Sequence, residues 1–164
     1  MTLPSQEPDG SRPSAQDRAR AIGASAVQKF VEEPYNCAEG VVAAFSEARG
    51  EPPRTLTALA SPFGGGVGSL GHMCGALAGG LIVLGRRAGE LGLARSVTRG
   101  LVQELHRGFE ATFGTTACRE LTAHDCEAAG GAPYDVRSCA RYLAHVAEKT
   151  SELMDRAERT TSCF

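Results

Sequence analysis

A glycine-rich stretch from Ser61 to Gly85, SPFGGGVGSLGHMCGALAGGLIVLG, constrains the fold of this 164-residue chain more than any other segment. It holds nine glycines, one cysteine and no charged side chain. Its apolar part, from Cys74 to Leu84, is too short to span a bilayer and predicts a buried core segment. The preceding glycines can take positive φ and turn backbone N–H groups toward Cys74. We expect this backbone surface at four positions, namely Gly64, Gly65, Gly66 and Gly68.

The letters GVGSLG within this stretch match the GxGxxG pattern of dinucleotide-binding loops. That pattern carries weight only between a strand and a helix of a βαβ unit. The preceding RTLTALASPF is a poor strand, and no parallel-sheet pattern follows. The glycines are better explained by close helix packing, because Gly71, Gly75 and Gly79 are spaced four apart. Such a face suits either the domain core or a homodimer interface.

Outside the glycine-rich stretch, apolar residues recur at helical spacing, and strand-like alternation is short. The sequence predicts an all-α, single-domain bundle of about five or six helices, with the glycine loop before a central buried helix. We expect a disordered tail over 1–13, the helical domain over 14–158 and a flexible C-terminus over 159–164. Within the domain, Pro34 ends a first helix, and Asn36 caps the second. A last helix is expected to run from Asp135 to Ala157.

The charge and composition exclude several classes of partner. The net charge is -2, aromatic residues make up 5% of the chain, and tryptophan is absent. A chain of this kind offers neither a basic surface for nucleic acid or anionic membrane nor a stacking platform for bases. The N-terminus has no secretory signal pattern, so we expect a cytoplasmic protein whose thiols stay reduced.

The six cysteines include no CxxC pair, so neither a zinc ribbon nor a thioredoxin-like dithiol has local support. Four of them are expected in or near the first turn of a helix, where unpaired N–H groups favour a thiolate and lower its pKa. We expect these four to converge as metal ligands: Cys37, Cys74, Cys118 and Cys139. Of these, Cys74 and Cys37 are the expected nucleophiles.

Three further residues have a weaker claim. His72 stands two positions before Cys74 and is a candidate accessory ligand or proton carrier. Cys126 lies between Asp125 and Glu127, which disfavour a thiolate, and Cys163 is next to the C-terminus. Both cysteines stay outside the predicted central site, although either could act as a resolving thiol.

Several segments together resemble the C-GCAxxG-C-C family of redox-active proteins. They are NCAEG at 36–40, FGGGVG at 63–68, CGALAGG at 74–80, FGTTACREL at 113–121 and the later Cys139. By this resemblance, Cys37, Cys74, Cys118 and Cys139 are the four cysteines that name the family. The resemblance implies a redox or metal role without defining a reaction. A similar domain occurs in split-Soret cytochrome c, whose haem-binding CxxCH is absent from this chain.

Three functions remain open from the sequence. The first is a metal protein, in which the four thiolates hold an iron–sulfur cluster, or zinc or copper, for electron transfer or oxidoreductase chemistry. The second is a metal-free thiol–disulfide oxidoreductase acting on an unknown redox partner or small-molecule substrate. The third is a non-catalytic helical interaction module, dimeric through the glycine-bearing helix.

Overall fold

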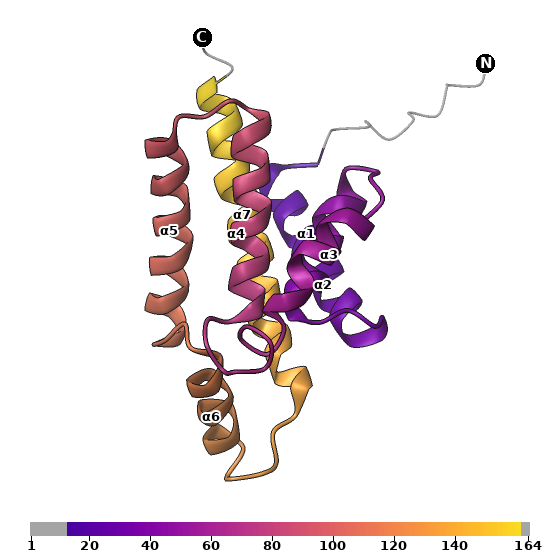
Figure 1. The fold of residues 1–164 in the computed structure, drawn as a ribbon, viewed down its shortest axis with the longest axis vertical. Coiled ribbons are helices and arrows are strands. Elements are labelled where there is room, and N and C mark those ends of the chain that lie inside the picture. Colours follow the sequence, from indigo (N-terminus) through magenta and orange to yellow (C-terminus); the bar gives the residue numbers. More distant parts are fainter. Residues whose placement is uncertain (1–12, 162–164) are drawn as a thin grey trace, which may run out of the picture.

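The computed structural model describes residues 13–161, and this part of the chain is an assembly of helices (Figure 1). The α-helices are α1 (Ala15–Glu32), α2 (Cys37–Ala48), α3 (Arg54–Ala60), α4 (Gly75–Glu90), α5 (Arg95–Phe113), α6 (Cys118–Ala128) and α7 (Ala140–Thr161). Two 3-10 turns are η1 (Ser61–Phe63) and η2 (Val136–Cys139). The all-α prediction is confirmed. There is one helix more than predicted, because the short segment before the glycine loop forms α3.

Helices α4 and α7 lie side by side in the middle of the molecule (Figure 1). Helix α5 packs on one side of this pair, while α1 and α2 pack on the other. The glycine loop and α6 lie together at one end, beyond the start of α4. The central, buried position predicted for the helix after the glycine loop is therefore that of α4.

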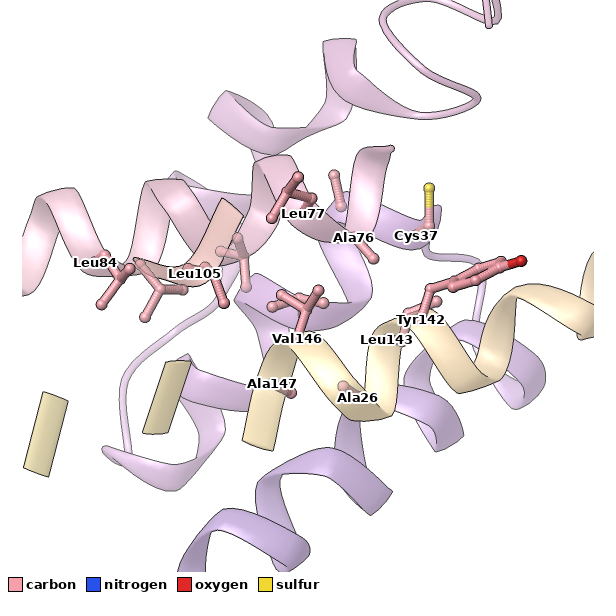
Figure 2. Packing of buried hydrophobic residues seen from close by; sticks show 14 of the residues in the cluster. Ala26, Cys37, Ala76, Leu77, Leu84, Leu105, Tyr142, Leu143, Val146 and Ala147 are labelled. Atoms are coloured by element: carbon pink, nitrogen blue, oxygen red, sulfur yellow. The ribbon is translucent and has the colours of Figure 1, made fainter. Parts of the chain in front are cut away.

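The core between these helices is built mainly from small and branched side chains (Figure 2). The largest side chains that are almost fully buried include Tyr142, Phe109, Leu77, Leu84, Leu121 and Leu143. Figure 2 shows Cys37 and Tyr142 at the same end of this core. The cysteine end of the molecule is thus continuous with the hydrophobic core.

The first two helices begin at capping boxes, and the cap predicted at Asn36 for the second helix is confirmed. Ser14 and Asp17 form a capping box at α1, and Asn36 and Glu39 form another at α2. In each box the cap side chain accepts from backbone N–H groups of the first turn, while the acidic residue accepts from the cap N–H. The Asn36 box fixes the position of Cys37, the first residue of α2.

The glycines of α4 serve packing within the chain. A Cβ at Gly79 would lie 2.7 Å from the Ala38 carbonyl oxygen on α2, and one at Gly80 would lie 2.6 Å from Val146 on α7. Gly71, predicted on the same helical face as Gly75 and Gly79, lies instead in the loop with φ of 72°. Helix α2 occupies the glycine face of α4, so this face does not support the homodimer prediction.

The start of the last helix differs from the prediction. Asp135 caps the 3-10 turn η2 through the N–H of Arg137, and α7 begins only at Ala140. Val136 consequently leaves the buried seam of the helix and is 56% exposed. Cys139 ends the 3-10 turn instead of lying within the helix.

The predicted tail and C-terminus fall largely outside the described residues, which exclude 1–12 and 162–164. Cys163 belongs to that part of the chain. Over residues 13–161, no helix combines the length and the apolar character needed to cross a bilayer.

Candidate functional site

Four cysteines from four separate elements line one small cavity. Cys37 comes from α2, Cys74 precedes α4, Cys118 begins α6 and Cys139 ends η2. The rest of the lining is apolar or uncharged: Gly75, Ala76, Leu121, Thr122, Tyr142 and Leu143. The structure therefore brings together the four cysteines that the sequence singled out, in a setting with no charged side chain in its described lining.

Cys37 and Cys74 meet where the starts of α2 and α4 touch. Both side chains are buried, and both cysteines are free thiols. A Cβ at Gly75 would lie only 2.4 Å from the Cys37 sulfur and 2.8 Å from the Phe63 carbonyl oxygen. No residue other than glycine fits at Gly75 without moving the thiol or the backbone. The absence of a side chain at Gly75 leaves room for the sulfur of Cys37.

Two backbone hydrogen bonds position Cys118 next to the glycine loop. The N–H of Cys118 donates to the His72 carbonyl at 2.6 Å, and the N–H of Cys74 donates to the Thr116 carbonyl at 2.8 Å. At Gly66, where φ is 75°, a Cβ would lie 2.6 Å from the Cys118 Cβ. The first residue of α6 therefore packs directly against the glycine loop.

Cys139 is held from the solvent side by Tyr134. The Tyr134 hydroxyl lies 2.7 Å from the Cys139 sulfur, and the Tyr134 residue is 41% exposed. Tyr134 belongs to the exposed connection between α6 and η2. This connection therefore contacts the site at the Cys139 thiol.

Burial dominates the acid–base behaviour of three of the thiols. It raises the pKa of Cys74 to about 12 and that of Cys139 to about 11, and it also raises the pKa of Cys118. The amides of Leu77 and Ala76 act in the opposite direction on Cys74, as expected at a helix start, but do not offset burial. The prediction that helix starts lower these three pKa values is therefore wrong.

The thiols also oppose one another's ionisation. A thiolate at Cys37 raises the pKa of Cys74, Cys118 and Cys139, as a smaller effect than burial. The charge state of Cys37 therefore affects the pKa values of the three other thiols. Each further negative charge is unfavourable in this cavity unless a cation or proton compensates it.

The cavity is nearly filled by its own side chains. Its volume is about 10 Å³, close to the smallest space that holds one water molecule. Within residues 13–161, no three His, Cys, Asp or Glu side chains stand in an arrangement ready to hold a metal ion. The four thiols share a cavity, but binding a metal there requires their side chains to rearrange.

The other predicted site residues lie outside this cavity. The His72 side chain is exposed, and Cys126 is half-buried on α6 without lining the cavity. Gly64 and Gly68 donate their N–H groups to the carbonyls of Ser61 and Pro62, so these amides stabilise the loop itself. Gly65 and Gly66 take positive φ, as expected for this loop.

Three site residues were missed by the sequence analysis. Tyr142 lines the cavity, and its hydroxyl donates to the buried carboxylate of Asp125 at 3.1 Å. Tyr142 follows Cys139 by three positions, a spacing that could have placed both on one face. Tyr134 and Asp125 gave no comparable signal, because a loop residue and one of three acids on a mostly polar helix follow no apolar period.

The comparison with protein families decides what kind of protein this is. Residues 35–153 match the model of the family described as "Putative redox-active protein (C_GCAxxG_C_C)". The chain belongs to this family. The match contains all four cysteines of the cavity, so the C_GCAxxG_C_C region and the candidate site coincide. No curated protein and no solved structure matches the chain.

Proposed function

We propose that this C_GCAxxG_C_C protein holds a thiophilic metal centre, in the first instance an iron–sulfur cluster, on Cys37, Cys74, Cys118 and Cys139. The observation that carries the proposal is their shared position around one uncharged cavity, reached from four elements. Thiolates are the ligands of iron–sulfur clusters and suit zinc and copper as well. Such a centre would supply one-electron chemistry, in agreement with the redox character of the family.

The acid–base state of the thiols supports a metal over a free nucleophile. A buried thiol with a raised pKa is almost fully protonated at neutral pH, and the protonated form does not attack disulfides. A metal cation displaces these protons and neutralises thiolates that otherwise repel one another. Burial therefore disfavours free thiolates, and a bound cation would offset most of the charge that makes them unfavourable.

The cavity volume sets a condition on binding. A space of about 10 Å³ admits no cluster while the thiols occupy their present positions. The cysteine side chains, including that of Cys139 in contact with Tyr134, must turn before four sulfurs can surround a centre. Loading is therefore expected to loosen the contact between Tyr134 and Cys139.

The test compares single cysteine-to-serine variants after anaerobic purification and reconstitution with iron and sulfide. Wild type should show thiolate-to-iron absorption bands with iron and sulfide in stoichiometric amounts. Serine at Cys37, Cys74, Cys118 or Cys139 should reduce bound iron, whereas Cys126→Ser, outside the cavity, should not. Wild-type protein that stays colourless and metal-free, or a Cys126→Ser variant that loses as much iron as Cys118→Ser, would overturn the proposal.

The second candidate is a metal-free dithiol–disulfide couple, which the close approach of α2 and α4 favours. Cys37 and Cys74 lie on either side of this contact, and their charges interact. Joining them would release two protons and two electrons to an oxidising disulfide, which would become two thiols. Titration of free thiols before and after a mild oxidant should then show a reversible loss of two, abolished in Cys37→Ser and unaffected in Cys126→Ser.

A further inference from the structure

The larger open space of the structure does not reach the thiols. It is a groove of about 290 Å³ between α5 and α7, and none of the cysteines within residues 13–161 lines it. Two ion pairs form its rim, Glu104 with Arg156 and Lys149 with Glu152. A row of three aromatic rings packs between the groove and the cysteine cavity: His145, Phe113 and Tyr142. Access to the thiols must therefore come through another wall of the cavity.

Helix α6 forms one wall of the cysteine cavity and lies beyond the end of the bundle (Figure 1). Cys118, Leu121 and Thr122 of this helix line the cavity. Of its eleven residues, two are buried, namely Leu121 and Asp125, whereas α2 and α4 bury nine residues each. A segment with few buried contacts opens at a lower free energy than the core of the same domain. Among these three walls, α6 is therefore the one that separates most easily.

The two ends of α6 are attached in different ways. At its start, the N–H of Cys118 donates to the His72 carbonyl at 2.6 Å, which ties the helix to the glycine loop. After its end, Gly130 and Gly131 take φ of 70° and 81°, and a Cβ at either would meet no atom within 4 Å. Glycine changes backbone conformation at low cost. An outward turn of α6 can therefore pivot at Cys118 and bend the chain at the two glycines.

A polar contact holds the far end of α6 against α7. The buried carboxylate of Asp125 accepts through Oδ1 from the side chains of Arg141 and Tyr142. Its Oδ2 is also buried and has no hydrogen-bond partner among the described residues. A carboxylate oxygen in this position loses its hydration without compensation and regains it when the helix turns outward. The contact that closes α6 thus includes a cost that opening removes.

We propose that α6 turns outward as a unit about Cys118, by breaking the Asp125–Arg141 contact, and that this opening admits small thiol reagents and metal ions to Cys37 and Cys74. These two thiols are at most 9% exposed in the closed position. Removal of Leu121 from the cavity wall uncovers them, while α2, α4 and α7 stay packed. The opening does not depend on a metal centre, whereas its role as the route of metal uptake rests on the proposed function.

The test measures alkylation by iodoacetamide of each cysteine in the full, reduced, metal-free chain, with the modified positions identified by mass spectrometry. Cys37 and Cys74 should react more slowly than Cys126, which does not line the cavity. Their rates should depend weakly on urea below the unfolding transition, because turning one short helix exposes little surface. Global unfolding, followed by circular dichroism in the same urea series, should show a much steeper dependence. Hydrogen exchange should also be faster in the amides of α6 than in those of α4.

Two arginine variants test the contact that closes the helix. Arg141→Ala leaves the buried Asp125 without its ion-pair partner, so alkylation of Cys37 and Cys74 should be at least about tenfold faster. The weak dependence of these rates on urea should persist. Arg137→Ala is the matched control, because it removes an exposed arginine of η2 four residues earlier. It should leave both rates unchanged.

Four outcomes would overturn the proposal. They are alkylation of Cys37 and Cys74 that is as sensitive to urea as global unfolding, equal rates in Arg141→Ala and wild type, equal acceleration by both arginine variants, and hydrogen exchange in α6 no faster than in α4. A chain that opens as expected but takes up neither iron nor zinc would instead refute the proposed centre. The opening of α6 would then stand on its own.

Discussion

The cysteine cavity and the groove between α5 and α7 are opposites in almost every physical property. The cavity holds about 10 Å³ and has uncharged walls, whereas the groove holds about 290 Å³ and has a charged rim. The cavity has reactive groups without space, and the groove has space without thiols. The difference shows that the four thiols and the larger open space lie in different parts of the fold, with the Phe113 ring packed between His145 at the groove and Tyr142 at the cavity.

Gly75→Ala should have the largest effect, because it tests how tightly the cavity is built. The new Cβ would lie 2.4 Å from the Cys37 sulfur, and overpacking of this kind should lower the free energy of unfolding by about 3 kcal/mol. Urea denaturation measures the change. Gly85→Ala, on the same helix where a Cβ meets nothing, should instead raise the free energy of unfolding by up to about 1 kcal/mol. Equal effects of the two would show that the cavity is not tightly packed.

Tyr142→Phe should have the next largest effect, since it removes a hydroxyl at the join between cavity and aromatic row. Asp125 is buried and then keeps only Arg141 as a side-chain partner among its described hydrogen bonds. We expect a loss of about 1–2 kcal/mol in the free energy of unfolding. Tyr134→Phe, at a residue that is 41% exposed, should cost less than about 0.5 kcal/mol. A reversed order would contradict the burial of the Tyr142–Asp125 contact.

Alkaline pH should destabilise the metal-free, reduced protein through Cys74. Its folded pKa of about 12 lies above the ordinary value of 9.0, so the folded state binds the proton more tightly than the unfolded state. The stabilising contribution is complete below about pH 9 and is lost as pH rises toward 12. At pH 10 the loss should be about 1 kcal/mol. Cys74→Ala should lack this part of the pH dependence, and identical slopes for variant and wild type would disprove it.

Glu104→Gln should have the smallest effect, because the groove rim is exposed. Both partners of the Glu104–Arg156 pair have about half of their side-chain surface in solvent. Such pairs contribute less than about 1 kcal/mol to stability, and salt screens them. Unfolding in urea should therefore be almost unchanged. A loss in the free energy of unfolding comparable with that of Tyr142→Phe would show that the Glu104–Arg156 pair stabilises the fold.

Local patterns in the sequence predicted the fold class and much of the helix layout. Apolar spacing identified the long helices, and Asn36 marked the start of α2 through its side-chain chemistry. The start of the last helix was misplaced because Asp135 caps a 3-10 turn, which the same residue pattern does not distinguish from an α-helix. Gly71 was misplaced for a similar reason, since a four-residue spacing alone does not show where a helix begins.

The four cysteines of the candidate site could be predicted from the sequence, but their burial and pKa values could not. Helix-start placement and family resemblance selected the four cysteines that line the cavity. The direction of the pKa shifts depended on burial, which is set by Leu121, Leu143 and other residues far from each thiol in sequence. The groove was not predicted, because its lining combines residues of α5 and α7 that are far apart in the sequence.

The backbone hydrogen bonds between the glycine loop and α6 also determine when the site can form during folding. His72 and Cys118, joined by a 2.6 Å hydrogen bond, are 46 residues apart in the chain. The segment between them contains α4 and α5, so closing this long loop costs conformational entropy that only the docking of both helices offsets. Contacts of such long sequence separation form slowly compared with helix formation. The thiols of Cys74 and Cys118 therefore remain apart, and exposed to oxidation or wrong pairing, until the helical framework is nearly complete.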